Sequence, residues 1–148
     1  MMPTARTLEG LRAELAAVDP GALRSRGAMS PAVALGHCAQ SIEYSISGYP
    51  RAKPWPVRRL IGPRLLARFR AARRMRHDLA APVPGAPSLA EGPPVQAMQR
   101  LLAAIDAFLA HRGPWPEHLA FGRMDRAAYA DAHWLHIRNH LEEIDFAP

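Results

Sequence analysis

Apolar residues recur at intervals of three and four along most of the chain, which is the pattern of amphipathic helices. The first such segment runs from about Thr7 to Val18 and ends at the turn-forming Asp19-Pro20-Gly21. A second segment begins at Ser30-Pro31, where serine is a good N-cap and proline suits the first helical position, and it continues to about Ser47. The first third of the chain is therefore predicted to form two helices.

The same pattern continues through the rest of the sequence. A further helical segment is expected from about Pro63 to Asp78, between loops rich in proline and glycine. Helices are also predicted from Pro94 to about His111 and, after an N-cap at Asp125, from about Arg126 to Asp145. No stretch alternates apolar and polar residues, so no sheet is predicted. The sequence thus predicts an all-α protein: a four-helix bundle with an extra helical and loop excursion between its second and third helices.

Length and composition narrow the class of protein. A chain of 148 residues can bury its own core, and residues 1–148 are expected to form a single domain. There is no apolar run of 18 residues, and the N-terminus carries charges where a signal peptide has its apolar core. The single cysteine, Cys38, excludes an internal disulfide and a cysteine-based zinc finger. We therefore expect a soluble cytoplasmic protein with no membrane partner.

The charge is strongly basic, with 19 Lys and Arg against 13 Asp and Glu, a net charge of +6. Eight arginines crowd residues 58–76, and two interpretations are open. They could bind nucleic acid or an acidic partner as part of a non-catalytic helical binding module, or they could form a solvated helix surface. The arginines spread around the predicted helix without interleaved aromatic residues, so the solvated surface is favoured and a nucleic-acid partner is not expected.

Histidines give the last predicted helix its most informative chemistry. His136 and His140 are four residues apart and share one helical face, and His133 precedes them on the same stripe as Tyr129 and Ile137. Unpaired imidazoles in a core are costly. Two explanations remain open: ordinary surface or hydrogen-bonded core histidines, or a divalent metal site that uses neutral imidazole nitrogens as ligands.

A third ligand for such a metal would come from the second helix. A catalytic metal site commonly has three protein ligands and one open position. His37 is the candidate, and it shares a face with Val33, Ser41 and Tyr44. Imidazole ligands suit several divalent transition metals, so the expected cofactor is zinc, nickel or iron, without a choice among them.

Two longer stretches carry a family resemblance. Residues 35–54 read LGHCAQSIEYSISGYPRAKP, and residues 120–146 read AFGRMDRAAYADAHWLHIRNHLEEIDF. A His-Cys-Ala-Gln-Ser segment followed by Gly-Tyr-Pro, together with a Phe-Gly turn before a terminal histidine-rich helix, resembles a branch of the DinB-like (DinB/YfiT-like) superfamily of metalloenzymes. That branch is classed as a domain of unknown function. The resemblance covers both motif segments and, more loosely, the LIGPRL stretch between them.

The resemblance implies a four-helix bundle with a divalent metal held by three histidines, which match His37, His136 and His140. His133 matches a position that is often histidine or polar, and it would contact the ligands or serve as an extra ligand. Three residues follow His37 on or near its face and are candidates to line the pocket, with ordinary helix packing as the alternative: Gln40, Ser41 and Tyr44.

The chain departs from the family pattern at two positions. Asn139 stands where a second consecutive histidine is common, and Glu143 stands where glutamine is usual. Related members include thiol-dependent S-transferases and a maleylpyruvate isomerase. By analogy, the chain is expected to be a metal-dependent enzyme, either a thiol-dependent transferase or a hydrolase. Its substrate would be a small molecule such as a low-molecular-weight thiol. A homodimer is compatible with this class, and the sequence identifies no catalytic residue.

The remaining histidines and the cysteine receive structural interpretations. His77 and His111 lie near the ends of predicted helices, where a cation complements the helix dipole. His118 precedes the Phe121-Gly122 turn and either rims the site or lies exposed in a loop. Cys38 points about 100° away from its neighbour His37 on a helix and is expected to be a small buried hydrophobe.

Overall fold

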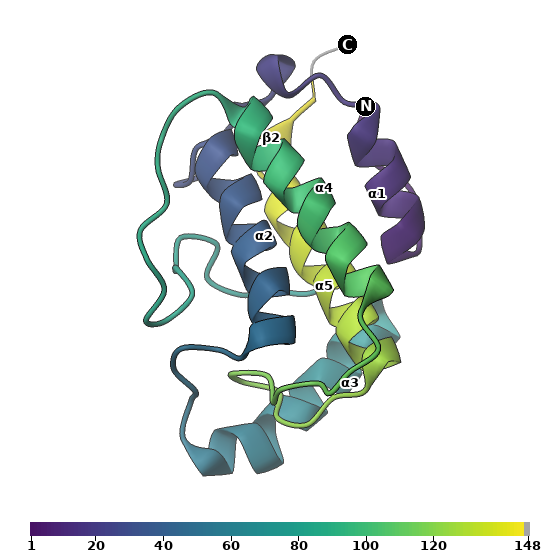
Figure 1. Cartoon of the computed structure of the whole chain (residues 1–148), viewed down its shortest axis with the longest axis vertical. Helices are drawn as coiled ribbons and strands as arrows, with labels where there is room; N and C mark the ends of the chain where they lie inside the picture. The colour runs from purple at the N-terminus through teal and green to yellow at the C-terminus, as the bar shows by residue number, and fades with distance from the viewer. Residues whose placement is uncertain (147–148) are drawn as a thin grey trace.

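The computed structural model describes residues 1–146, and these residues are mostly helical, as the sequence predicts (Figure 1). The helices are α1 (Leu8–Ala16), α2 (Pro31–Ser47), α3 (Gly62–Ala72), α4 (Pro94–Ala110) and α5 (Arg126–Leu141). Shorter elements are the 3₁₀ turn η1 (Pro20–Ala22), the π-helical turn η2 (Val57–Ile61), and the strands β1 (Arg24–Ser25) and β2 (Ile144–Asp145).

The helices begin where the sequence places their caps. The side chain of Ser30 accepts a hydrogen bond from the backbone N–H of Val33, and Asp125 does the same for Ala128. Each bond satisfies one backbone donor that the first turn of a helix leaves unpaired. The starts of α2 and α5, which carry the candidate ligands, are thereby fixed by local sequence.

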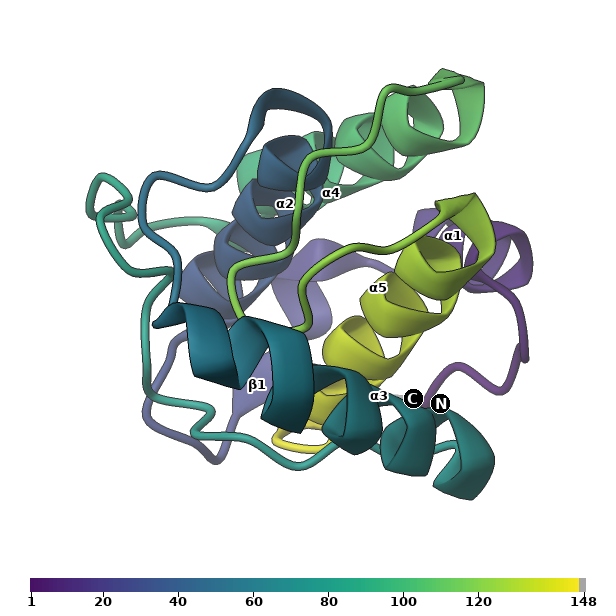
Figure 2. The same ribbon diagram turned by 90° about the horizontal axis from the view of Figure 1, so that it is seen from below.

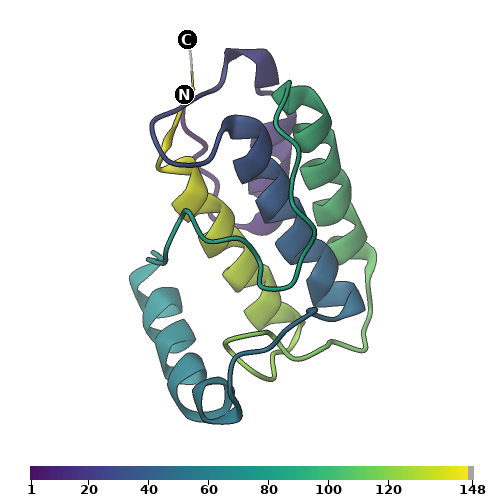
Figure 3. The same ribbon diagram turned by 90° about the vertical axis from the view of Figure 1, so that its left-hand side faces the viewer.

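Four of the helices pack around a common apolar core. α2 contacts α4 and α5, and α1 contacts the same two helices, while α3 lies outside this group and contacts α5 (Figures 1 and 3). Viewed from below, α3 crosses the near end of the molecule (Figure 2). The core is built from fully buried side chains of α1, α2, α4 and α5, among them Leu11, Leu35, Ile105, Phe108 and Leu135. No helix within residues 1–146 is long and apolar enough to cross a membrane.

The predicted boundaries of the third helical segment were wrong. The element η2 already begins at Val57, six residues before Pro63, and α3 ends at Ala72, six residues before Asp78. Arg73 adopts a left-handed conformation with φ 53°, and its N–H bonds to the carbonyl of Arg70, which closes the last turn. Apolar periodicity does not reveal such a stop, because Arg73 is neither glycine nor asparagine.

The end of the last helix and the absence of a sheet were also predicted wrongly. α5 ends at Leu141, and Ile144–Asp145 then forms β2, which pairs antiparallel with β1. Strands of two residues are too short to show an alternating pattern. The pairing nevertheless ties the C-terminal segment to the turn before α2, so the two helices that carry the predicted ligands are connected at one end.

Residues 73–93 form a long connection between α3 and α4. Figure 3 shows this loop passing over α5 and α2 before it reaches the start of α4. It is held in place by contacts with α2: the side-chain amide of Gln40 donates to the carbonyl of Pro87 at 3.1 Å, and Leu89 packs against Gly36. Met75 and Val83 are buried. The loop is therefore an ordered cover over the space between α2 and α5.

The loop before α5 approaches the η2–α3 segment very closely. A Cβ atom on Gly62 would lie 1.8 Å from the carbonyl oxygen of Ala120, and one on Gly122 would lie 2.4 Å from that of Arg58. Gly122 also has a φ of +75°, which favours glycine. These two contacts fix the segment around His118 against α3.

Candidate metal centre

Three predicted ligands meet between α2 and α5. His37 projects from α2, while His136 and His140 project from successive turns of α5. Nε2 of His37 lies 3.1 Å from Nε2 of His136. The ring centroids of His37 and His140 are 4.7 Å apart, and those of His136 and His140 are 4.8 Å apart. The structure therefore brings together the three histidines that the helical faces singled out.

A fourth histidine, His77, joins them from the 73–93 loop. One ring nitrogen from each of His37, His77, His136 and His140 lies within 4.8 Å of the corresponding nitrogens of the other three. We call these four residues the histidine cluster. His77 was expected near a helix end and outside the site, but α3 stops at Ala72 and the following loop turns back over α5. No local pattern around His77 signals the return.

Asn139 positions His77. Nδ1 of His77 lies 2.7 Å from Oδ1 of Asn139, and the amide oxygen can only accept, so Nδ1 of His77 carries the proton of this bond. In the neutral ring, Nε2 then has the free lone pair. Asn139 is buried on α5, immediately before His140. The departure from the family pattern noted at this position thus supplies a partner for the fourth histidine.

Burial keeps the cluster neutral. His37 and His140 are only 4% and 3% exposed, His136 is half-buried, and His77 is exposed. Burial lowers the pKa of His37 to about 4 and that of His140 to about 3, with a further contribution from neighbouring histidines. The pKa of His136 lies well below its usual value, chiefly because of burial. The pKa of His77 is also lowered, chiefly by desolvation, because its ring lies against the other three histidines although the residue as a whole is exposed. The cluster thus offers neutral imidazole nitrogens near neutral pH.

Hydrogen bonding leaves part of the cluster unsatisfied. The pair His37–His136 can share one proton through their Nε2 atoms. Within residues 1–146, Nε2 of His140 and Nδ1 of His37 are buried and have no hydrogen-bond partner. A buried polar nitrogen without a partner is costly. The cluster is therefore not a closed network of hydrogen-bonded core histidines, which was the structural alternative to a metal site.

His133 lies outside the cluster. Its Nε2 is 2.9 Å from Oγ of Ser45, and its ring packs edge-on against Phe108. Ser45, on α2, is completely buried and donates its hydroxyl proton to the carbonyl of Ile42, so it accepts the hydrogen bond from Nε2–H of His133. This histidine is thus hydrogen-bonded inside the core, one turn from His136.

The three predicted pocket residues are placed differently from one another. Ser41 lines the cavity described below, and its carbonyl accepts a hydrogen bond from the hydroxyl of Tyr49. Gln40 is buried and anchors the 73–93 loop, while Tyr44 packs beside Tyr49, with ring centroids 6.0 Å apart. Cys38 is buried in the core, and burial raises the pKa of its thiol, as expected of a small hydrophobe.

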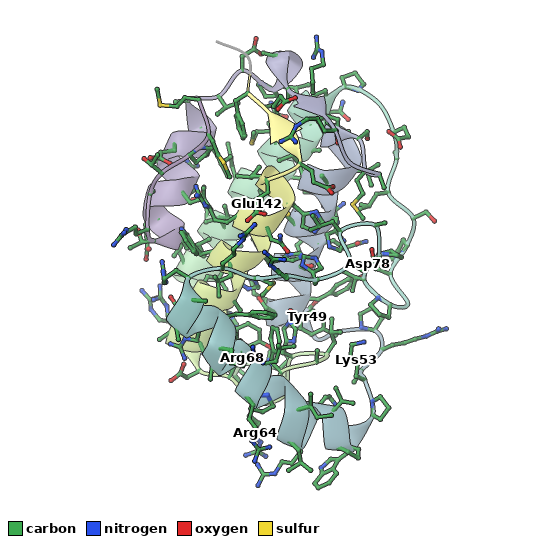
Figure 4. All side chains as sticks on the ribbon, turned by 180° about the vertical axis from the view of Figure 1, so that it is seen from behind. Tyr49, Lys53, Arg64, Arg68, Asp78 and Glu142 are labelled. Atoms are coloured by element: carbon green, nitrogen blue, oxygen red, sulfur yellow. The ribbon has the colours of Figure 1, made fainter. Side chains whose placement is uncertain are left out.

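A cavity of about 320 Å³ opens onto the histidine cluster. His37, His77 and His136 form part of its wall, and the wall also includes His118, which the sequence left as either a rim or an exposed residue. Figure 4 shows Tyr49 and Lys53 after α2 and Asp78 on the 73–93 loop, all of which line it. Five larger apolar side chains also line the cavity: Leu65, Phe69, Met75, Val83 and Phe121.

Comparison with known proteins places the chain in a family. The model of the family described as "Protein of unknown function (DUF1569)" matches residues 4–146. The chain belongs to this family. Comparisons with curated proteins and with solved structures found no match. Family membership therefore assigns no activity, and the DinB-like relationship remains a prediction.

Half of the crowded arginines have acidic partners in the structure. Arg58 pairs with Glu117, Arg70 and Arg73 with Asp131, and Arg74 with Glu142. These pairs fasten η2 and α3 to the loop before α5 and to α5 itself. The arrangement accounts for four of the eight arginines as structural contacts, which agrees with the favoured interpretation of a solvated helix surface; binding of nucleic acid or an acidic partner by residues 58–76 stays an untested alternative.

His133, which is buried outside the cluster, is expected to make the folded protein less stable in acid. Burial lowers the pKa of His133 to about 3, whereas histidine in an unfolded chain titrates near 6.5. The unfolded state therefore binds the proton first. The contribution of His133 to the free energy of unfolding is fully present above about pH 6.5. It falls by up to about 1.4 kcal/mol per pH unit as the pH drops toward 3.

Urea unfolding of metal-free protein, with His133→Gln as the comparison, measures this effect. The difference in the free energy of unfolding between wild type and variant should be constant above neutral pH and shrink steadily between pH 6 and 4. A difference that does not change with pH would contradict the assignment.

Proposed function

We propose that this protein binds one divalent transition-metal ion at the histidine cluster and is a metal-dependent enzyme. The observation that carries the proposal is the convergence of four ring nitrogens within 4.8 Å, from two helices and a loop, with three of the four histidines lining a cavity. Burial opposes protonation of the rings, so their lone pairs are available as ligands.

The donor set fits such an ion. Zinc–nitrogen bonds are about 2.0–2.1 Å long, so two ligand nitrogens in tetrahedral geometry lie roughly 3.3 Å apart. The Nε2 atoms of His37 and His136 are 3.1 Å apart, close to that spacing. An ion would also use the lone pair of the buried, unpaired Nε2 of His140.

The contact between Asn139 and His77 also supports the proposal. Histidines that bind metals usually donate their other ring N–H to an oxygen acceptor, which fixes the tautomer and the ring orientation. Nδ1 of His77 has such an acceptor in the buried Oδ1 of Asn139, at 2.7 Å. This hydrogen bond leaves Nε2 of His77 free to act as a ligand.

The cofactor and the activity follow from the donor set and the resemblance. Imidazole nitrogens suit zinc, nickel and iron. An ion held by neutral imidazoles keeps its full charge and would supply Lewis-acid chemistry at the wall of the cavity. With the DinB-like four-helix architecture that the motifs suggest, this supports a transferase or hydrolase acting on a small molecule, with a low-molecular-weight thiol as one candidate. Cytoplasmic location and homodimerisation are expectations from the sequence.

Metal titration of untagged protein tests the proposal. Protein stripped with a chelator should bind about one zinc or cobalt ion per chain, and His136→Ala should bind substoichiometrically. His111→Ala is the matched control, because His111 contacts the carbonyl of Pro114 and lies outside the cluster. Wild-type protein that binds no ion, or a His111→Ala variant that loses as much metal as His136→Ala, would refute it.

A further inference from the structure

His118 is held in one orientation by its own turn. Nδ1 accepts hydrogen bonds from the backbone N–H groups of Ala120 and Phe121, both at 3.1 Å. The ring stacks on Phe121, with centroids 4.5 Å apart. The backbone of His118 exchanges two hydrogen bonds with that of Gly122. Because Nδ1 is occupied as an acceptor, the neutral ring carries its proton on Nε2.

The Nε2–H group of His118 is an unused donor beside the cavity. Within residues 1–146 it has no protein hydrogen-bond partner, and the ring forms part of the wall of the cavity that His37, His77 and His136 also line. Burial lowers the pKa of His118 to about 3, so the ring stays neutral and acts as a donor through this nitrogen. A ligand oxygen in the cavity is the natural acceptor for it.

Two cationic side chains line the same cavity as this donor. The backbone N–H of Lys53 bonds to the carbonyl of Leu119, the residue next to His118, at 2.8 Å. Lys53 and Arg76 both line the cavity, and neither belongs to an ion pair within residues 1–146. Asp78 is the one carboxylate among the lining residues, and its side chain accepts from the N–H of Ala80. The rim therefore has an excess of positive charge.

The remaining wall is mostly apolar. Leu65 and Phe69 come from α3, Met75 and Val83 from the loop, and Phe121 from the turn that holds His118. At about 320 Å³ the cavity is at the lower end of the size range of small-molecule sites, which is about 300–1,000 Å³. Its size and lining suit a small ligand with an apolar body and a single polar end.

We propose that this cavity binds a small, largely apolar carboxylate, whose oxygen accepts a hydrogen bond from Nε2–H of His118 and whose charge is complemented by Lys53. As a substrate assignment it rests on the proposed function, because the carboxylate would be presented beside the metal-binding cluster. Binding itself depends on His118 and the cavity and needs no metal. His118 is thus a specificity-determining residue of the site.

The test uses 3-phenylpropionate as the probe and the uncharged 3-phenylpropionamide as its isostere. Calorimetric titration of full-length, metal-free protein in chelator should show binding of the carboxylate at millimolar concentration and about tenfold weaker binding of the amide. Carboxylate binding should shift the amide NMR signals of Ala120 and Phe121. Equal affinity for the two probes, or no carboxylate binding, would overturn the proposal without depending on any variant.

Three variants assign the contacts. His118→Asn keeps an oxygen that can accept from the backbone N–H groups of the turn but removes the Nε2–H donor, so it should weaken carboxylate binding about tenfold. Lys53→Met should weaken it about threefold, while Arg68→Met, an exposed cation on α3 outside the cavity wall, should leave it unchanged. Thermal unfolding checks that each variant is folded. Wild-type affinity in folded His118→Asn would overturn the assignment.

The same titration with zinc-loaded protein distinguishes carboxylate binding at His118 from carboxylate binding to the metal. Carboxylate binding to metal-free protein that is lost in His118→Asn supports the cavity assignment even when zinc titration finds no ion. Binding that requires zinc and is insensitive to His118→Asn would place the carboxylate on the metal and refute the role of His118.

Discussion

Zinc in about a hundredfold excess over its dissociation constant is expected to raise the free energy of unfolding by about 2.7 kcal/mol. For a chain of this size that corresponds to a rise in Tm of roughly 5–10 °C. The physical reason is that the four proposed ligands come from α2, α5 and the 73–93 loop, so only the folded chain brings them together. Thermal unfolding of untagged protein, with and without zinc, measures the effect.

His140→Ala should remove most of this stabilisation. His140 is buried, and its Nε2 has no hydrogen-bond partner within residues 1–146. The substitution therefore breaks no hydrogen bond at that nitrogen, and a smaller rise in Tm with zinc would reflect the loss of a ligand. His111→Ala should keep the full rise in Tm. If the cluster were only a set of core histidines, His140→Ala would lower Tm equally with and without zinc, and zinc would not change the Tm of the wild type.

The sequence predicted the helix boundaries that local hydrogen bonds determine better than those that tertiary contacts determine. Ser30 and Asp125 cap helices that begin as expected, because each supplies a side-chain acceptor to its own first turn. The end of α3 depends on the left-handed Arg73, and the end of α5 depends on strand pairing with β1, more than 100 residues earlier. Neither cause leaves a periodic signal.

The candidate site divides in the same way. His136 and His140 share a face because a helix repeats every 3.6 residues, and the packing of α2 on α5 brings His37 to them. His77 reaches the cluster only because the loop returns over α5, and His118 reaches the cavity through a close backbone contact at Gly62. Residues in loops acquire such positions from the whole fold, and neighbouring sequence gives little indication of them.

The placement of His77 on a loop leads to the second large expected effect. Loss of a hydrogen bond that supports a metal ligand typically costs tenfold to a hundredfold in metal affinity. His77→Ala removes the ligand itself, so it should weaken zinc binding by at least that much. Asn139→Ala should cost about tenfold to a hundredfold, because it removes the acceptor that orients His77. Asn139→Asp keeps an acceptor oxygen and should retain most of the affinity. Competition titrations with a chromophoric chelator measure all three variants.

Hydrogen exchange then shows whether His77 itself links the ion to the loop. Zinc should slow amide exchange in residues 73–93 of the wild type, since the ion would connect the loop to α2 and α5, whereas in His77→Ala exchange in this segment should be the same with and without zinc. Zinc that protects the loop equally in His77→Ala would show that the other three histidines form the complete site. Unchanged zinc affinity in Asn139→Ala would show that its bond to His77 does not orient a ligand.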